Sequence, residues 1–149
     1  MNSLPVSNSP GRSRSCIFAN PQLHREGAAA ADTPPGTIGF FDNTTKKFTA
    51  SVDGNEAAIL YVANYDYLRC KTVDDVIKAG DWVVAFHPTP GVFFNVPAAA
   101  GTYTKGQPLS VANGRVKAVG TDESVRCYVE EDRSYTISTT GQLLRVVIK

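Results

Sequence analysis

Residues 109–119 read LSVANGRVKAV, and this stretch decides the fold. Asn113-Gly114 supplies the two residues with positive φ that a type I′ turn requires. The two-residue loop sets the strand pairs as Leu109 with Ala118, Ser110 with Lys117, Val111 with Val116 and Ala112 with Arg115. This register places apolar side chains on one face and polar ones on the other, so turn chemistry and hydrophobic pattern agree on a β-hairpin.

Short runs of the same kind lie on both sides of the hairpin, from residue 37 to residue 149. They are rich in β-branched and aromatic residues, and Gly, Pro, Asn and Asp separate them, as in a sandwich or barrel. We expect strands at residues 37–41, 47–52, 57–63, 81–86, 92–96, 109–111, 115–119, 124–130, 135–138 and 142–148. The fold class predicted is mainly β, with a small barrel-like domain.

One segment, TVDDVIKAG at residues 72–80, carries helical signals. Thr72 stands where an N-cap is needed, two aspartates follow in the first turn, and Gly80 can end the helix. The residues expected on the face that covers the sheet are Val73, Val76 and Ile77. The sequence therefore predicts one short helix in an otherwise β domain.

Residues 1–36 differ in character from the rest of the chain. They contain five prolines, many Ser and Asn, and no apolar period of 2 or 3.6. Such a segment buries too little surface to offset the entropy lost when it becomes ordered. We expect an extended N-terminal arm over residues 1–36, with a reach of about 120 Å, and a β-rich domain over residues 37–149.

The charge balance excludes several classes of partner. Fifteen Lys and Arg oppose 14 Asp and Glu in the 149 residues, for a net charge of +1, so no field of one sign is available to hold nucleic acid or a membrane surface. No apolar run approaches the roughly 18–20 residues that a bilayer requires, and the start of the chain has no apolar signal region. We expect no nucleic-acid partner, no membrane partner and synthesis in the cytoplasm.

Three cysteines, Cys16, Cys70 and Cys127, are spaced widely. An odd number at this spacing is neither a disulfide framework nor a metal-binding pair. We expect three free thiols, with Cys70 and Cys127 acting as small apolar residues.

No pattern typical of a catalytic or metal site is present. The sequence has no phosphate-binding loop and no cluster of His and Cys at ligand spacing. His24 lies in the arm and His87 at the end of a strand, Asp74-Asp75 fits a helix start, and Glu130-Glu131-Asp132 fits a solvated turn better than a calcium loop. We expect no catalytic, cofactor-binding or metal-binding residue, no cofactor, and no enzyme activity.

Two further features have two interpretations each. Arg12 and Arg14 in GRSRS could contact phosphate or an acidic partner, or belong to a solvated tether. Tyr61, Tyr65 and Tyr67 share one face if their strand is continuous, so they could form a flat aromatic surface for a carbohydrate or pack in a core or interface.

The stretch from Lys105 to Lys149, KGQPLSVANGRVKAVGTDESVRCYVEEDRSYTISTTGQLLRVVIK, resembles the C-terminal part of lambda-type head decoration (cement) proteins of tailed bacteriophages. The residues that carry the resemblance are Gly106, Leu109, Asn113, Gly114, Val116, Lys117, Ala118, Gly120, Val125, Val129, Gly141, Leu143, Leu144, Arg145 and Val146. The arm, the middle helix and the segment PTPGVFFNVPAAAG at residues 88–101 depart from the minimal pattern of that family.

The resemblance implies a β-tulip fold and a structural virion protein that binds the outer surface of the capsid shell and stabilises it. The partners it implies are the major capsid protein and the chain itself, as a homotrimer or a dimer, on the capsid exterior after synthesis in the host cytoplasm. The arm is the kind of segment that contacts neighbouring subunits. The alternatives are another virion component, such as a head fibre or tail protein, and a carbohydrate-binding β module.

Overall fold

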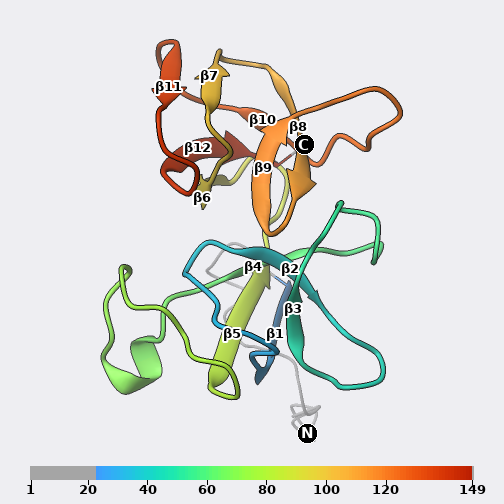
Figure 1. Ribbon diagram of the computed structural model, residues 1–149, viewed down its shortest axis with the longest axis vertical. Helices are drawn as coiled ribbons and strands as arrows, with labels where there is room; N and C mark the ends of the chain where they lie inside the picture. Colours follow the sequence, from blue (N-terminus) through green and yellow to red (C-terminus); the bar gives the residue numbers. More distant parts are fainter. Residues whose placement is uncertain (1–22, 149) are drawn as a thin grey trace, which may run out of the picture.

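The computed structural model describes residues 23–148, which form two lobes stacked along the longest axis of the molecule (Figure 1). The first lobe holds β1 (Leu23–Ala28), β2 (Ile38–Phe41), β3 (Phe48–Ala50), β4 (Tyr61–Ala63) and β5 (Trp82–His87), in the order β1-β5-β4-β2-β3, and a short 3-10 helix (Tyr67–Arg69). The second holds β6 (Phe93–Pro97), β8 (Pro108–Ala112), β9 (Arg115–Ala118), β10 (Cys127–Val129) and β12 (Leu143–Val147), in the order β6-β12-β10-β8-β9. There β7 (Gly101–Tyr103) and β11 (Tyr135–Ile137) pair as a separate small sheet. The mainly β prediction is confirmed.

Each five-stranded sheet curls until its two edge strands meet. In the first lobe, Ala29 just after β1 forms a parallel bridge with Phe48 of β3. In the second lobe, Ala98 just after β6 forms a parallel bridge with Val116 of β9. Each lobe is therefore a small barrel, closed at one point by a bridge of the same kind.

The two lobes repeat one topology. When β7 and β11 are set aside, both sheets have the strand order 1-5-4-2-3 counted within the lobe, and their ladders are antiparallel. Single hydrogen bonds repeat as well: the N–H of Gly36 donates to the carbonyl of Ala63 at 2.8 Å, and that of Gly106 donates to Val129 at 2.9 Å. We conclude that residues 23–148 contain two copies of one structural unit.

The cores of the two lobes correspond position by position. Eight buried residues form the core of the first lobe, and register and bridges give seven of them a buried counterpart in the second. The pairs are Ala29 and Ala98, Phe41 and Val111, Phe48 and Val116, Tyr61 and Cys127, Ala63 and Val129, Val83 and Leu144, and Ala85 and Val146. Each large apolar side chain buried in this way contributes about 1.5–3 kcal/mol.

The tip of the β8–β9 hairpin joins the lobes through the main chain (Figure 1). The N–H of Ile38 donates to the carbonyl of Gly114 at 2.9 Å, and the N–H of Gly114 donates to the carbonyl of Ser51 at 2.7 Å. The N–H of Asn113 donates to the carbonyl of Val52 at 3.0 Å. The turn of the second lobe thus extends the hydrogen bonding of the first.

Apolar contact reinforces this junction. Ile38, Leu60 and Val62 of the first lobe are buried in the core cluster of the second. The Arg126 guanidinium also donates from Nη2 to the carbonyl of Gly54 across the junction. A hydrogen-bonded turn and a shared core hold the two lobes together as one body.

The hairpin prediction is confirmed residue by residue. All four predicted pairs from Leu109 with Ala118 to Ala112 with Arg115 are present. Asn113 and Gly114 have φ of 50° and 75°, as a type I′ turn requires. All ten predicted strands are also present, with shifted ends, whereas β1 and β7 were not predicted.

The predicted helix at residues 72–80 is wrong. The carboxylate of Asp75 accepts hydrogen bonds from the N–H of Thr72 at 2.7 Å and from its hydroxyl at 3.0 Å, and the hydroxyl accepts a longer one from the N–H of Asp74 at 3.4 Å, which closes a turn and not a helix. Ile77 then forms an antiparallel bridge with Thr33. Local side-chain hydrogen bonds and a long-range bridge replace the helix.

The predicted boundary of the arm after residue 36 is also corrected. β1 pairs with β5 over six residues, from Leu23 opposite His87 to Ala28 opposite Trp82. Residues 23–36 therefore belong to the first lobe, because pairing with β5 supplies the order that their own pattern does not. Residues 1–22 of the predicted arm lie outside the described residues.

Substitution of Gly114 should weaken the junction between the lobes. A Cβ at this position would lie 2.8 Å from Cγ2 of Thr37, and the new residue would have to keep a φ of +75°. We expect Gly114→Ala to lower the free energy of unfolding by about 2–4 kcal/mol, from backbone strain and overpacking together. The control Gly106→Ala has a φ of +81° but nothing within 4 Å, so it should cost only about 1–2 kcal/mol. Urea unfolding of both variants measures the difference, and equal losses would contradict the role of the junction.

Two truncations should show where the arm ends and the first lobe begins. A chain that starts at residue 23 keeps β1 and should still unfold in one cooperative, native-like transition. A chain that starts at residue 37 removes β1 from β5 and residue 29 from its bridge to Phe48, so the first lobe should unfold. Circular dichroism during heating measures both, and a cooperative, native-like melt of the shorter chain would contradict the revised boundary.

Candidate binding surface

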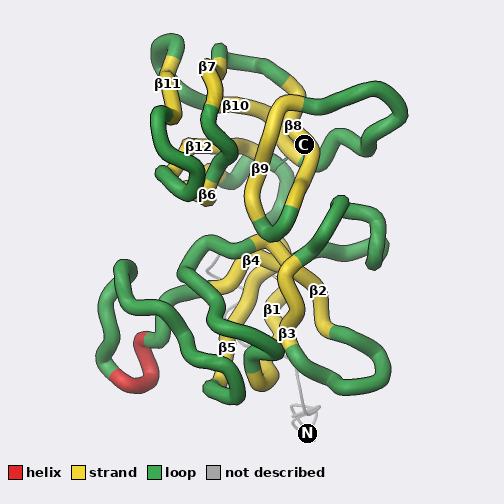
Figure 2. The backbone as a smooth tube through the Cα atoms, viewed as in Figure 1, coloured by secondary structure: helices red, strands yellow, loops and turns green. Residues whose placement is uncertain are grey.

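Exposed apolar side chains gather on the loop between β4 and β5, residues 64–81, which we call the β4–β5 loop. Their exposed fractions range from 37% to 63% and belong to Tyr65, Tyr67, Leu68, Val73 and Val76. Figure 2 shows this loop, with the short helix, standing out from the side of the first lobe. In the second lobe, residues 130–142 expose only one such side chain, Tyr135. An exposed apolar cluster of this kind is typical of a binding surface.

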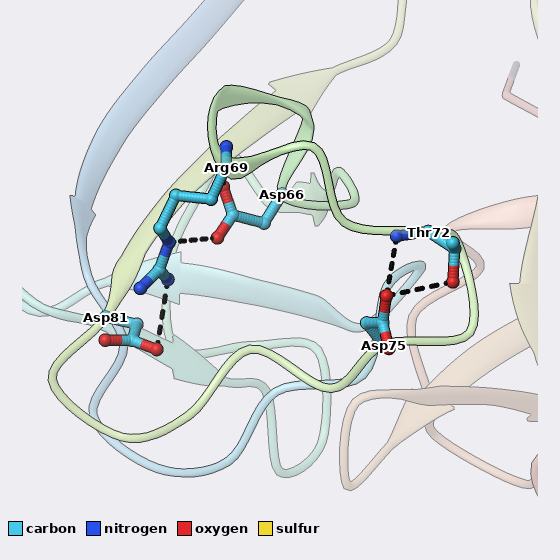
Figure 3. A network of polar contacts seen from close by, with 5 residues as sticks. All are labelled: Asp66, Arg69, Thr72, Asp75 and Asp81. Carbon is cyan, nitrogen blue, oxygen red and sulfur yellow. Dashed lines mark hydrogen bonds and ion pairs between the residues drawn. The ribbon is translucent and has the colours of Figure 1, made fainter.

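A polar network ties the two ends of the β4–β5 loop together (Figure 3). Nε of Arg69 lies 2.5 Å from Oδ2 of Asp66 near the start of the loop, and Nη2 lies 3.0 Å from Oδ2 of Asp81 at its end. The hydrogen bond from Arg69 lowers the pKa of Asp81 below its ordinary value. The guanidinium is thus a strut between two carboxylates.

Two further carboxylates fix the middle of the loop. The main-chain N–H and the hydroxyl of Thr72 donate to Asp75 (Figure 3) and lower the pKa of its carboxyl group. Asp32, from the segment after β1, pairs with Lys78 at 2.8 Å and accepts the N–H of Ala79 at 3.0 Å, and the bond from Lys78 lowers the pKa of Asp32. Four carboxylates, those of Asp32, Asp66, Asp75 and Asp81, therefore hold the loop.

The three tyrosines predicted to share a face are separated. β4 ends at Ala63, so the strand is not continuous. Tyr61 is buried, with its ring centroid 5.3 Å from that of Phe41. Tyr65 and Tyr67 are exposed on the β4–β5 loop and meet edge to face, with centroids 6.0 Å apart. Core packing takes one tyrosine, and the other two belong to the exposed apolar surface.

The two histidines lie on the paired strands β1 and β5, where His24 is opposite Phe86 and His87 is opposite Leu23. His24 is exposed on β1. His87 ends β5, as the sequence predicts, but it is half-buried and its Nδ1 lies 2.7 Å from the carbonyl of Leu60. This contact ties the end of β5 to the chain that leads into β4.

The acidic run after β10 is paired with basic side chains. Glu130 lies 2.9 Å from Nζ of Lys105, and Asp132 lies 3.0 Å from Nη2 of Arg145. Glu131 accepts the N–H of Arg145 at 2.8 Å. Within residues 23–148 no group of three or more His, Cys, Asp or Glu could hold a metal ion. No helix in this part of the chain is long and apolar enough to cross a membrane.

The two described cysteines differ in environment, and both are free thiols. Cys127 is buried, and burial raises the pKa of its thiol to about 12, so it is unreactive at neutral pH. Cys70 is exposed after the short helix, with a φ of 55°, so the expectation that it acts as a buried apolar residue is wrong. Cys16, Arg12 and Arg14 lie outside the described residues.

A cleft of about 240 Å³ opens between the two lobes. Its lining is mostly apolar and comes from both lobes: Ile38, Ala58, Leu60, Val62, His87, Pro88, Pro90, Phe94, Val96, Val111, Val125, Arg126, Cys127, Val146 and Ile148. Nε of Arg126 is buried and has no hydrogen-bond partner among the described residues. Pockets for small ligands usually measure about 300–1,000 Å³, so this cleft suits one or two side chains better than a cofactor.

Comparison with known proteins gives a likeness of fold. No model of a known protein family and no curated protein matches the chain, so the resemblance of its last third to lambda-type decoration proteins stays a prediction. The solved structure of the head fibre gp8.5 N base of bacteriophage phi29 is similar, with a TM-score of 0.56 and 13% identity. The match covers 86% of this chain and 94% of that one, so both lobes take part in it.

Removal of the Arg69 strut should loosen the β4–β5 loop without unfolding the barrel. In Arg69→Met, hydrogen exchange at the amides of residues 69–71 should become roughly three- to tenfold faster. Local opening of the wild-type loop must break the two ion pairs of Arg69, and the variant has no such pairs to break. Amides of β5 should keep their protection. Lys71→Met is the matched control, since its ammonium makes no ion pair within the described residues. Equal effects of the two variants, followed by mass spectrometry, would contradict the strut.

Proposed function

We propose that this chain is a structural protein of a bacteriophage virion that binds the outer surface of the capsid shell and stabilises it, without catalysis. The observation that carries the proposal is the likeness of fold to a phage head fibre base over 86% of the chain. The resemblance of residues 105–149 to head decoration proteins points independently to the same part of a virion.

The β4–β5 loop is the surface we assign to the shell. Its exposed apolar side chains can be buried in a contact with the major capsid protein. The struts from Arg69 and Lys78 fix the loop beforehand, so less conformational entropy is lost on binding. Occupancy of many sites on one particle allows each single contact to be weak.

Residues 1–15 are assigned to contacts with neighbouring subunits. Their composition suits a chain that becomes ordered against a partner surface. The chain itself would assemble as a homotrimer or a dimer, and each arm would reach an adjacent copy or capsid subunit on the exterior of the virion.

A second candidate within the same class is the base of a head fibre. The specific observation in its favour is that the solved structure with a similar fold is the N base of a head fibre. A fibre base must also bind the rest of the fibre, whereas a decoration protein carries no further protein on its outer side. Electron microscopy of particles with this protein bound distinguishes a projecting fibre from a compact knob.

Binding to capsids should depend on the β4–β5 loop. Recombinant protein should co-sediment with expanded capsids that lack it, and Val73→Asp should weaken this at least about tenfold, because a charge replaces an apolar contact. The control is Val52→Asp, which changes a valine of matching exposure, 64% against 63% for Val73, outside the loop.

The results of this experiment test the assigned binding surface and the capsid-binding function separately. Binding that is unaffected by either variant, or reduced equally by both, would remove the β4–β5 loop from the contact while the virion role stands. Wild-type protein that stays in the supernatant would contradict the capsid-binding function itself.

A further inference from the structure

The path of the chain before β1 begins beside the cleft between the lobes. Leu23, the first described residue, pairs with His87, and His87 lines the cleft. Pro88 and Pro90, which continue from His87 toward the second lobe, line it as well. Because proline has no N–H to donate, the ladder between β1 and β5 is poorly continued past this point. The described chain therefore begins beside the cleft.

The segment that precedes β1 contains an apolar run of suitable size. Residues 16–19 read Cys-Ile-Phe-Ala, and the rest of residues 7–22 is polar apart from proline and glycine. Phe18 lies five positions before Leu23, and a fully extended chain of this length spans about 17 Å. The run can reach the cleft without a long connection.

We propose that Ile17 and Phe18 of the same chain bind in the cleft between the lobes. The cleft, at about 240 Å³, is small and lined mostly by apolar side chains, which fits two apolar side chains attached to a peptide. A peptide carbonyl would also give Nε of Arg126 an acceptor after a small rotation of its side chain. The short tether raises the effective concentration of the chain's own segment far above that of a second copy.

Binding of Ile17 and Phe18 gives the arm a fixed origin. Residues 1–15 would then leave the body from the waist between the lobes, and both lobes would contact one segment. The inference concerns the chain alone and holds whether or not the protein binds a capsid.

A disulfide cross-link in the full-length chain tests the proposal. Ala58 is exposed and lines the cleft, so Ala58→Cys offers a thiol there to the native Cys16. In every variant the exposed Cys70 is replaced by Ser, and Cys127, which is buried but lines the cleft, is replaced by Ala. Thr136→Cys, exposed on β11 at the far end of the second lobe (Figure 1), is the control. Mild oxidation with copper–phenanthroline, a non-reducing gel and peptide mapping follow the products.

The proposal expects an intramolecular link between residues 16 and 58, formed at least about tenfold faster than the link between residues 16 and 136. Phe18→Ser should slow the first link about tenfold, since the loss of a buried aromatic side chain is of that size, and leave the second unchanged. Equal rates at positions 58 and 136, or no effect of Phe18→Ser, would overturn the proposal. A covalent dimer in place of the internal link would show that a second copy supplies the segment, and would overturn it too.

Discussion

The two lobes depend on one main-chain contact, the docking of the Asn113-Gly114 turn against the first lobe. The turn donates to Ser51 and Val52 and accepts from Ile38, so it completes hydrogen bonds that would otherwise be exposed at the end of the first sheet. With the turn in place, the apolar residues beside it close over a shared core. The cleft between the lobes follows from this arrangement.

The parts of the fold that sequence predicts are those in which local signals agree. In the hairpin, turn residues and alternation specify one register, and that register is found. β1 carries no such signal, since LHREGA is largely polar and takes its order from β5. The segment after Thr72 shows a helical pattern, but Asp75 and the bridge from Ile77 override it. The sequence points to Tyr65 and Tyr67 of the candidate surface but groups them with Tyr61 on one strand face, because strand periodicity does not apply to the loop in which they lie.

The internal repeat was invisible in the sequence for a physical reason. Corresponding positions share burial and hydrogen bonding, whereas their side chains differ: Phe48 corresponds to Val116, and Tyr61 to Cys127. Protein cores tolerate such differences when the total volume of the core and its pattern of apolar positions are kept. Loop lengths differ as well, because four residues separate Asp42 from Lys47 where the hairpin has two.

A contact made by the main chain places few demands on side chains. The hydrogen bonds at the docked turn need no particular side chain at Ile38, Ser51 or Val52, and the demands of backbone angle and space fall on Asn113 and Gly114. Different sequences can therefore keep this junction and with it the arrangement of the two lobes. A likeness of fold at 13% identity over 86% of the chain is compatible with such an architecture.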